Sequence, residues 1–204
     1  MKSWAAVILA ITTSLCAPMA HAIEEPEYTV VRRYADFEIR DYAPYLVAEV
    51  LVPGPAEQAG NQGFRILAAY IFGKNAGERK IAMTAPVIQA PAPAKIEMTA
   101  PVIQTAADGG YIVQFTMPHE FTLGTLPEPL DPRVKIKAVP AARYAVVRYS
   151  GTWSTRNYDQ HLEQLEQAVR AAGLRATGSP FYARYNPPFV PWFLRRNEIW
   201  IKLL

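Results

Sequence analysis

YTVVRRYADFEIRDYAPYLVAEVL, residues Tyr28–Leu51, is the stretch that decides the fold class of this chain. Its valine, isoleucine, tyrosine and phenylalanine content is typical of strands, and it predicts two of them, Tyr28–Tyr34 and Phe37–Leu51. Pro53-Gly54 then interrupts the pattern. Beyond this break, Ala56–Phe72 places apolar residues at helical spacing, which predicts an amphipathic helix.

The second half of the chain repeats this order of elements. A second helix is predicted at Thr155–Ala172, and Gly173 follows where a C-terminal cap belongs. Each half therefore reads strand, strand, helix, strand, strand. This order predicts a single α+β domain of two pseudo-symmetric β-β-α-β-β halves, forming an antiparallel, barrel-like sheet flanked by two helices. The other predicted strands are Tyr111–Met117, Val134–Ala138, Tyr144–Tyr149, Phe181–Tyr185 and Glu198–Leu203.

A decapeptide occurs twice between the two halves. KIAMTAPVIQ at Lys80–Gln89 returns as KIEMTAPVIQ at Lys95–Gln104. Proline pushes the preceding alanine toward extended geometry, so each copy is predicted to be strand-like with a fixed bend. Met83 and Met98 suit a wall that adapts to a flat apolar ligand, because thioethers fit irregular surfaces. Ordinary core packing with a redundant loop is the simpler explanation of the repeat, and the ligand-wall interpretation stays open as the alternative.

The N-terminus has the pattern of a secretory signal peptide. Lys2 precedes a short apolar run, Trp4–Ile11, and Ala20-His21-Ala22 provides an A-x-A cleavage site. We expect residues 1–22 to be removed, which leaves a domain of residues 23–204. The chain's one cysteine, Cys16, would leave with the signal. These features predict an exported, periplasmic protein. We expect no stable membrane insertion after cleavage, because no later apolar stretch approaches the length of about 20 residues that a membrane-spanning helix needs.

Charge and motif content argue against several functions. The chain carries 21 lysines and arginines against 18 acidic residues, scattered without a basic run, so we expect no nucleic-acid partner. His119 and His161 are far apart in sequence, so we expect no metal site. No nucleophile elbow or nucleotide-binding loop is present. We therefore expect no catalytic residues and no enzyme, with a hydrolase as a distant third interpretation.

The most unusual segment is YNPPFVPWFLRRNEIWIKL, residues 185–203. Prolines stiffen a loop that carries Phe189, Trp192 and Phe193, and Arg195 and Arg196 follow at once. Rigid aromatic rings beside guanidinium groups suit a planar apolar ligand with carboxylates at its edge. The alternative is a packed loop with a solvated arginine pair.

Five segments, taken in order from about Glu27 to the C-terminus, strongly resemble the SOUL haem-binding protein family. The M-T-A-P-V and R-N-E-[IV]-W elements are its most specific features, and the doubled motif resembles the exported bacterial branch. The segments are FEIRDYAPYLVAEV (Phe37–Val50), GFRILAAYIFGKN (Gly63–Asn75), KIAMTAPV (Lys80–Val87), VKIKAVPAARYAVVRYSGTWS (Val134–Ser154) and YNPPFVPWFLRRNEIWIKL.

The resemblance implies two pseudo-symmetric halves similar to small-molecule effector-binding domains. It also implies binding of haem or another tetrapyrrole in a cleft near the first helix and the neighbouring loops. Some members carry a proposed axial histidine in the second strand, where this chain has Asp41. Other members carry basic residues at the positions of Asn61, Ala69 and Val190. Haem binding here is therefore expected not to be led by histidine.

Together these observations predict an exported, non-catalytic protein that binds haem or another tetrapyrrole and sequesters or transfers it. A binder of a different apolar small molecule, or a protein-interaction module on the same fold, is the alternative. Of Arg195 and Arg196, one is expected to reach a ligand carboxylate or a carboxylate near Glu198 and the other to remain in water. The candidate binding residues are Phe64, Ile71, Met83, Met98, Phe189, Trp192, Phe193, Arg195 and Arg196.

Overall fold

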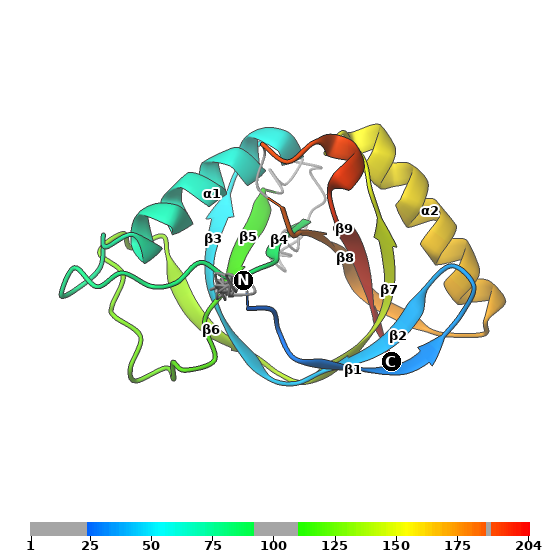
Figure 1. The fold of residues 1–204 in the computed structure, drawn as a ribbon, viewed down its shortest axis with the longest axis horizontal. Helices are drawn as coiled ribbons and strands as arrows, with labels where there is room; N and C mark the ends of the chain where they lie inside the picture. Colours follow the sequence, from blue (N-terminus) through cyan, green and yellow to red (C-terminus); the bar gives the residue numbers. More distant parts are fainter. Residues whose placement is uncertain (1–23, 92–109, 187–188) are drawn as a thin grey trace, which may run out of the picture.

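The computed structural model describes residues 24–91, 110–186 and 189–204 (Figure 1). The signal-peptide prediction, the second decapeptide copy and Met98 lie outside these residues. The described elements are β1 (Tyr28–Arg33), β2 (Glu38–Tyr42), β3 (Tyr45–Val52), α1 (Ala56–Ile71), β4 (Val87–Pro91), β5 (Tyr111–Thr116), β6 (Lys135–Val139), β7 (Ala142–Tyr149), α2 (Thr155–Ala171), β8 (Ala176–Arg184), the 3-10 turn η1 (Trp192–Leu194) and β9 (Asn197–Leu203).

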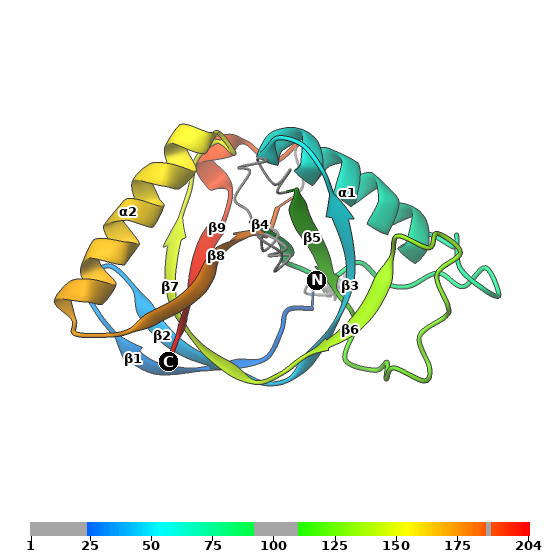
Figure 2. The same cartoon turned by 180° about the vertical axis from the view of Figure 1, so that it is seen from behind.

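The strands form one antiparallel sheet of nine, in the order β1-β2-β7-β9-β8-β4-β5-β3-β6. The sheet curls into a half-barrel, and α1 and α2 lie on its outer side, one against each half (Figures 1 and 2). This confirms the predicted α+β class and the barrel-like antiparallel sheet. We call the side that carries α1 and α2 the helix face, and the side within the curl the inner face. Neither helix in the described ranges is long and apolar enough to cross a membrane.

The strand order reveals how the two halves are joined. Read from either end, leaving out β1, it gives the same pattern when β2 is matched with β6, β3 with β7, β4 with β8 and β5 with β9. The matching is centred on the β4–β8 pair, where Ile88 faces Ala183. Each half also supplies an outer strand to the other, because β2 pairs with β7 and β6 pairs with β3. The predicted pseudo-symmetric halves are confirmed, with strands exchanged between them.

Two predicted strand boundaries are wrong. The strand predicted over Phe37–Leu51 is two strands, β2 and β3, separated at Ala43-Pro44. Proline has no backbone N–H to donate, and the break lets β2 pair with β7 while β3 pairs with β5 and β6. The strand predicted at Phe181 begins earlier, at Ala176, with a register shift between Thr177 and Phe181.

Both helices match their predictions to within one residue. The Ser154 side chain caps α2 by accepting a 3.3 Å hydrogen bond from the Asn157 N–H. Gly173 follows the helix in the left-handed region, at φ 70°. On α1, a Cβ added at Gly63 would lie 2.6 Å from the Val113 Cβ, so glycine is what lets this helix sit closely on β5.

The first decapeptide copy combines an irregular and a regular part. Val87–Pro91 forms β4, which runs through the centre of the sheet between β8 and β5. The residues before it have no regular secondary structure, and the Ala85–Pro86 peptide is cis. This matches the predicted strand-like segment with a fixed bend, and it places Met83 just ahead of the central strand.

Candidate ligand-binding site

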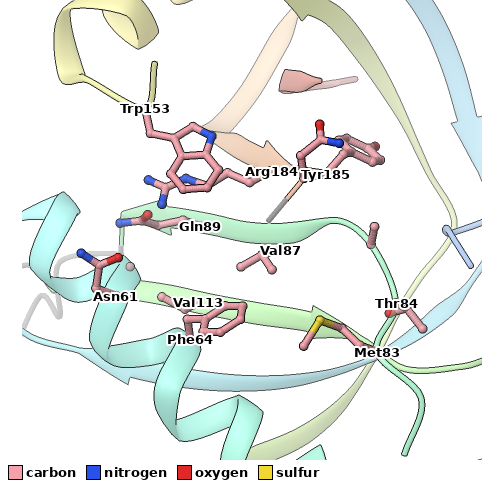
Figure 3. Close-up of a pocket in the computed structure, with 13 residues that line it drawn as sticks. Asn61, Phe64, Met83, Thr84, Val87, Gln89, Val113, Trp153, Arg184 and Tyr185 are labelled. Atoms are coloured by element: carbon pink, nitrogen blue, oxygen red, sulfur yellow. The ribbon is translucent and has the colours of Figure 1, made fainter. Parts of the chain in front are cut away.

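A pocket of about 350 Å³ lies on the helix face near the centre of the pseudo-symmetry (Figure 3). Alternation along β4 turns Val87 and Gln89 toward the helices and Ile88 toward the inner face. We call this the first pocket. It is lined by Gly60, Asn61, Phe64, Met83, Thr84, Ala85, Val87, Gln89, Val113, Trp153, Arg184, Tyr185 and Asn186.

One end of the first pocket is apolar. Phe64 on α1 lies edge-on to Phe115, with ring centroids 5.3 Å apart, and its ring is 37% exposed. Met83 lines the same end of the pocket in Figure 3 and is 41% exposed. Large apolar side chains left this open beside a hollow offer contact area to a ligand, because removing them from water is favourable. This end suits the apolar body of a small molecule.

The other end of the first pocket is polar and centred on Arg184. The Arg184 guanidinium carbon lies 5.0 Å from the Trp153 ring centroid and 4.7 Å from that of Tyr182. Trp153 is itself fixed, since its Nε1–H donates to the Asn197 side chain at 2.9 Å. Gln89 stands next to Arg184 in Figure 3, and its Nε2–H donates to the Ala56 carbonyl at 2.7 Å. Arg184 is the sole charged residue in the described lining of this pocket.

A second pocket of about 140 Å³ adjoins the first. The two share Gln89, Trp153 and Arg184, so these three side chains stand at the partition between them. The second pocket differs in being lined largely by phenol rings and by the start of α2. Its remaining lining residues are Ala56, Tyr111, Ser154, Thr155, Tyr158, Asp159 and Tyr182.

The inner face carries a network of paired charges centred on Glu198. The Glu198 carboxylate is fully buried, and Arg40 Nη1 donates to it at 3.1 Å and Arg196 Nε at 3.0 Å. The Tyr185 hydroxyl and the Trp200 indole N–H also donate to it, at 2.8 and 2.9 Å. Burial alone disfavours charged arginine, but the attraction of Glu198 raises the pKa of both Arg40 and Arg196. This network joins β9, which carries Glu198, to Arg40 on β2 and to Tyr185, which follows β8.

The structure brings together two of the predicted binding residues. Phe64 and Met83 both line the first pocket. Ile71 is 1% exposed and packs in the core under α1, so it lies in the core rather than in the pocket lining. Met98 lies outside the described residues.

The aromatic residues of the predicted loop lie outside the lining of the first pocket, although Asn186, which precedes them in sequence, belongs to that lining. Phe189, Trp192 and Phe193 are exposed, and the last two rings meet edge-on at 5.5 Å. The loop is joined to the turn before α2, because the Gly151 N–H donates to the Trp192 carbonyl at 3.0 Å. These aromatic rings stand near the site but are not packed into it.

Arg195 and Arg196 have different surroundings. The Arg196 side chain forms ion pairs with Glu198 and Glu25 at 2.8 Å each, which fits the predicted pairing near Glu198. The Arg195 guanidinium lies over the Trp153 ring, 4.2 Å from its centroid, and its Nε–H donates to the Val190 carbonyl. Arg196 therefore belongs to the inner-face network, whereas Arg195 borders the pocket partition.

Neither histidine in the described part of the chain lines the two pockets. His119 contacts Glu24 at 2.5 Å on the surface, and His161 stacks on Tyr149 beside α2. Asp41, at the position of the family's proposed axial histidine, is paired with Arg143 at 2.7 Å, and that guanidinium lowers the pKa of the Asp41 carboxyl. Of the other positions considered for ligand binding, Asn61 lies in the lining of the first pocket.

Sequence reasoning missed the polar end of the site. Trp153 and Arg184 are 31 positions apart in the numbering and meet only because β8 and the turn before α2 converge. One signal was available. Arg184 stands between two buried residues, Ala183 and Tyr185, and a charge in such a place calls for a partner or a ligand.

The family model described as SOUL heme-binding protein matches residues 23–202 of this chain. The chain belongs to the SOUL family. Two curated relatives are similar to it. Heme-binding protein 2 of Homo sapiens is 28% identical over 188 residues, 89% of this chain and 87% of the relative. Heme-binding protein 1 of Mus musculus is 26% identical over 148 residues, 72% of this chain and 73% of the relative.

Solved structures support the same fold at lower identity. The EcmrR C-terminal domain has a TM-score of 0.57 at 12% identity, covering 87% of this chain and 98% of that one. A hydrolase encoded by lin2189 from Listeria innocua has a TM-score of 0.55 at 13% identity, covering 84% of this chain and 94% of that one. At such identities the likeness concerns the fold alone. Family membership thus agrees with haem as a possible ligand of this SOUL protein.

Proposed function

We propose that this protein binds haem or a related tetrapyrrole in the first pocket and sequesters or transfers it without chemical turnover. The observation that carries the proposal is the pocket itself, an apolar hollow that ends at a single guanidinium group. Its volume, about 350 Å³, lies at the lower end of the range for small-molecule sites, about 300–1,000 Å³. A porphyrin combines a planar apolar ring with carboxylates on one edge, which is the chemistry that the two ends of the pocket offer.

We expect apolar contacts to supply most of the binding free energy of the ligand. Phe64 and Met83 both line the hollow and are partly exposed. Covering them stabilises the complex by about 25 cal/mol per Å² of apolar area, before the cost of ordering is subtracted. The exposed rings of Phe189, Trp192 and Phe193 follow the lining in sequence, and they are available to cover the outer part of a ligand larger than the pocket.

The iron of a bound haem is expected not to be held by histidine. His119 and His161 lie away from the described lining, and Asp41 is engaged with Arg143. The lining does offer the thioether of Met83 and the phenol of Tyr185, both of which are side-chain types that ligate haem iron. The Tyr185 hydroxyl already donates to Glu198, so Met83 is the better placed of the two.

Two titrations with haemin, followed through the Soret band, test this function. Phe64→Ala should weaken binding severalfold or more, whereas Phe72→Ala, at an exposed ring just past the end of the same helix and outside the pocket lining, should not. Replacing both His119 and His161 by alanine should leave the visible spectrum unchanged. Two results would contradict the proposal. One is saturable haemin binding whose affinity is the same in Phe64→Ala as in the parent, and the other is loss of a six-coordinate spectrum in the double histidine variant.

The absence of turnover rests on the composition of the site. No aspartate, glutamate, histidine or cysteine is among the described residues that line the first pocket, and the phenol there, that of Tyr185, is engaged in a hydrogen bond to Glu198. Incubating the protein with haemin and with chromogenic esters should return the haemin unchanged and the esters uncleaved. Hydrolysis that Arg184→Gln or Phe64→Ala abolishes would favour the hydrolase interpretation.

Export to a periplasm is a separate part of the proposal, and it is supported by the signal-peptide pattern of residues 1–22. Exported protein should begin at Ile23 in an intact-mass measurement. A mass that includes residues 1–22 would remove the export proposal and leave the binding proposal untouched. A non-porphyrin molecule that co-purifies in the pocket would favour the alternative of another apolar ligand.

A further inference from the structure

Arg184 differs from the two arginines of the inner-face network in having no acidic partner among the described residues. Arg40 and Arg196 are both paired with Glu198, but no carboxylate of the described residues lies within ion-pair distance of Arg184. Its Nε atom is buried and makes no hydrogen bond. A buried guanidinium donor without a partner is costly, so this arrangement calls for an anion that the chain does not supply.

The pseudo-symmetry shows that this charge is specific to one half. Gln89 on β4 and Arg184 on β8 occupy equivalent positions on either side of the Ile88–Ala183 centre. Gln89 is a neutral amide whose N–H is already used by the start of α1. The matched position thus holds a satisfied side chain in the first half and an unsatisfied cation in the second.

The surroundings of Arg184 hold it in place and leave room beside it. Its guanidinium lies over the rings of Trp153 and Tyr182, as Figure 3 shows for Trp153. Gly60 stands on its other side, where an added Cβ would lie 3.6 Å from Arg184 Nη1 and 2.8 Å from Gln89 Oε1. A positioned cation next to a backbone without a side chain is a suitable receptor for a small anionic group.

Other polar atoms near the partition are also unsatisfied. Tyr182 is 9% exposed and lines the second pocket, and its hydroxyl, like that of Tyr149, has no hydrogen-bond partner in the described part of the chain. Burial raises the pKa of both tyrosines, so their hydroxyls stay protonated and able to donate. Asp159 also lines the second pocket but is exposed, and it disfavours an anion at that outer edge.

We propose that Arg184 receives a carboxylate of the ligand at the junction of the two pockets, while the apolar body of the ligand fills the first pocket. The site then selects planar apolar acids over their neutral esters. This inference rests on the proposed function, and it adds the residue that binds the carboxylate of the ligand. Arg184 thereby sets ligand specificity.

Protoporphyrin IX and its dimethyl ester test the inference, because they share one ring and differ in charge. Each is titrated in the same dilute detergent, and binding is followed by porphyrin fluorescence. The parent protein should bind the diacid about 10- to 100-fold more tightly than the diester, the range for a charge-assisted hydrogen bond. Arg184→Gln should remove this preference while leaving diester binding unchanged.

Two further variants separate charge recognition from packing. Arg184→Lys keeps the charge but loses the planar fork, and should retain part of the preference. Arg175→Gln makes the same charge change at an exposed residue that lines neither pocket, and should behave as the parent. Melting temperatures of all variants are recorded, and Arg184→Gln should melt within a few degrees of the parent because it breaks no ion pair.

The outcomes are distinct. Equal binding of diacid and diester by the parent would overturn the inference while the proposed function stands. An Arg184→Gln variant that weakens both porphyrins equally, or melts far below the parent, would show that Arg184 only supports the fold and would also overturn it. Failure of the parent to bind either porphyrin would overturn the proposed function and the inference together.

Discussion

The buried charges at the centre of the sheet are paired on the inner face, whereas the helix face carries an arginine without an acidic partner among the described residues. On the inner face, Glu198 is fully buried and receives hydrogen bonds from two arginines, a tyrosine and a tryptophan. On the helix face, Arg184 lines two pockets without an acidic partner among the described residues. The contrast teaches that buried charge serves two purposes in this fold. The inner network is closed on itself, whereas the helix face keeps one charge open toward a hollow.

The largest predicted loss of stability concerns the charge network on the inner face. Glu198→Gln removes the carboxylate that Arg40 and Arg196 share, and leaves two buried guanidinium groups short of compensation. Because Arg40 also pairs with Glu38 and Arg196 with Glu25, we expect the lower end of the range for a broken buried pair, a loss of about 3 kcal/mol in the free energy of unfolding. Urea unfolding measures it.

The matched control is Glu163→Gln, an exposed glutamate on α2 whose loss should cost less than about 0.5 kcal/mol. The informative contrast is with Arg184→Gln, which should also cost little. Equal destabilisation by Glu198→Gln and Arg184→Gln would erase the difference between the two faces.

Close packing of the helix face beside the pocket is tested by Gly63→Ala. Alanine favours a helix by about 1 kcal/mol over glycine, but its Cβ would meet Val113 at 2.6 Å. Overpacking of this kind costs about 1–3 kcal/mol, so we expect a net loss of up to about 2 kcal/mol in thermal or urea unfolding. Gly60→Ala is the control, since its Cβ would be tight only against the flexible end of the Gln89 side chain and would lie at an ordinary contact distance from Arg184 Nη1. A more stable Gly63→Ala protein would show that α1 is not tightly seated.

A pair of tyrosines compares satisfied and unsatisfied hydroxyls on the helix face. The Tyr70 hydroxyl donates to the Pro127 carbonyl at 2.8 Å, whereas that of Tyr182 has no partner in the described chain. Tyr70→Phe should therefore cost about 1 kcal/mol in unfolding free energy, and Tyr182→Phe almost nothing. Equal losses would indicate that the Tyr182 hydroxyl is bound to water.

Tyr70 also predicts how the free energy of unfolding depends on pH. Burial raises the pKa of Tyr70 from 10 to about 12, so the folded state holds this proton more strongly than the unfolded state does. The stabilisation is complete below pH 10 and is lost as the pH rises toward 12. Tyrosinate absorbance and unfolding curves at pH 9 to 12 should show a decline that is shallower in Tyr70→Phe. An unchanged slope would contradict this assignment.

The smallest effect is expected at the loop beside the site. Phe189 is 84% exposed, so Phe189→Ala should change the unfolding free energy by less than about 0.5 kcal/mol. Haemin affinity in the same variant then reports on binding alone. A lower affinity at unchanged stability would place Phe189 over the bound ligand, and an unchanged affinity would restrict the site to the two pockets.

Local patterns predicted the helices well and the strand connections less well. The ends of α2 followed from apolar spacing and from Gly173, both of which are local signals. The division at Pro44 and the exchange of β2 and β6 between halves depend on pairing partners distant in sequence. Gly178 and Pro180 hid the start of β8, because both residues are typical of turns.

The candidate site shows the same limit. Phe64 and Met83 could be predicted, because each lies in a segment with its own apolar pattern. Ile71 has the same helical spacing as Phe64 but points into the core, and spacing alone does not separate a core residue from a pocket residue. Trp153 and Arg184 meet only in the folded chain. Sequence reasoning therefore found the apolar end of the site and missed the polar end.

The exchange of outer strands has a consequence for how the chain can be divided. A fragment ending near Pro118 would carry β3 without β6, and β2 without β7. Each fragment would expose an unpaired strand edge, the kind of edge that promotes association between chains. We therefore expect neither half to fold on its own, despite the internal symmetry. Two fragments cut in the Pro118–Pro132 connection should be unstructured or aggregate alone and reconstitute one fold when refolded together, which makes this connection a natural place to split the protein into a complementing pair.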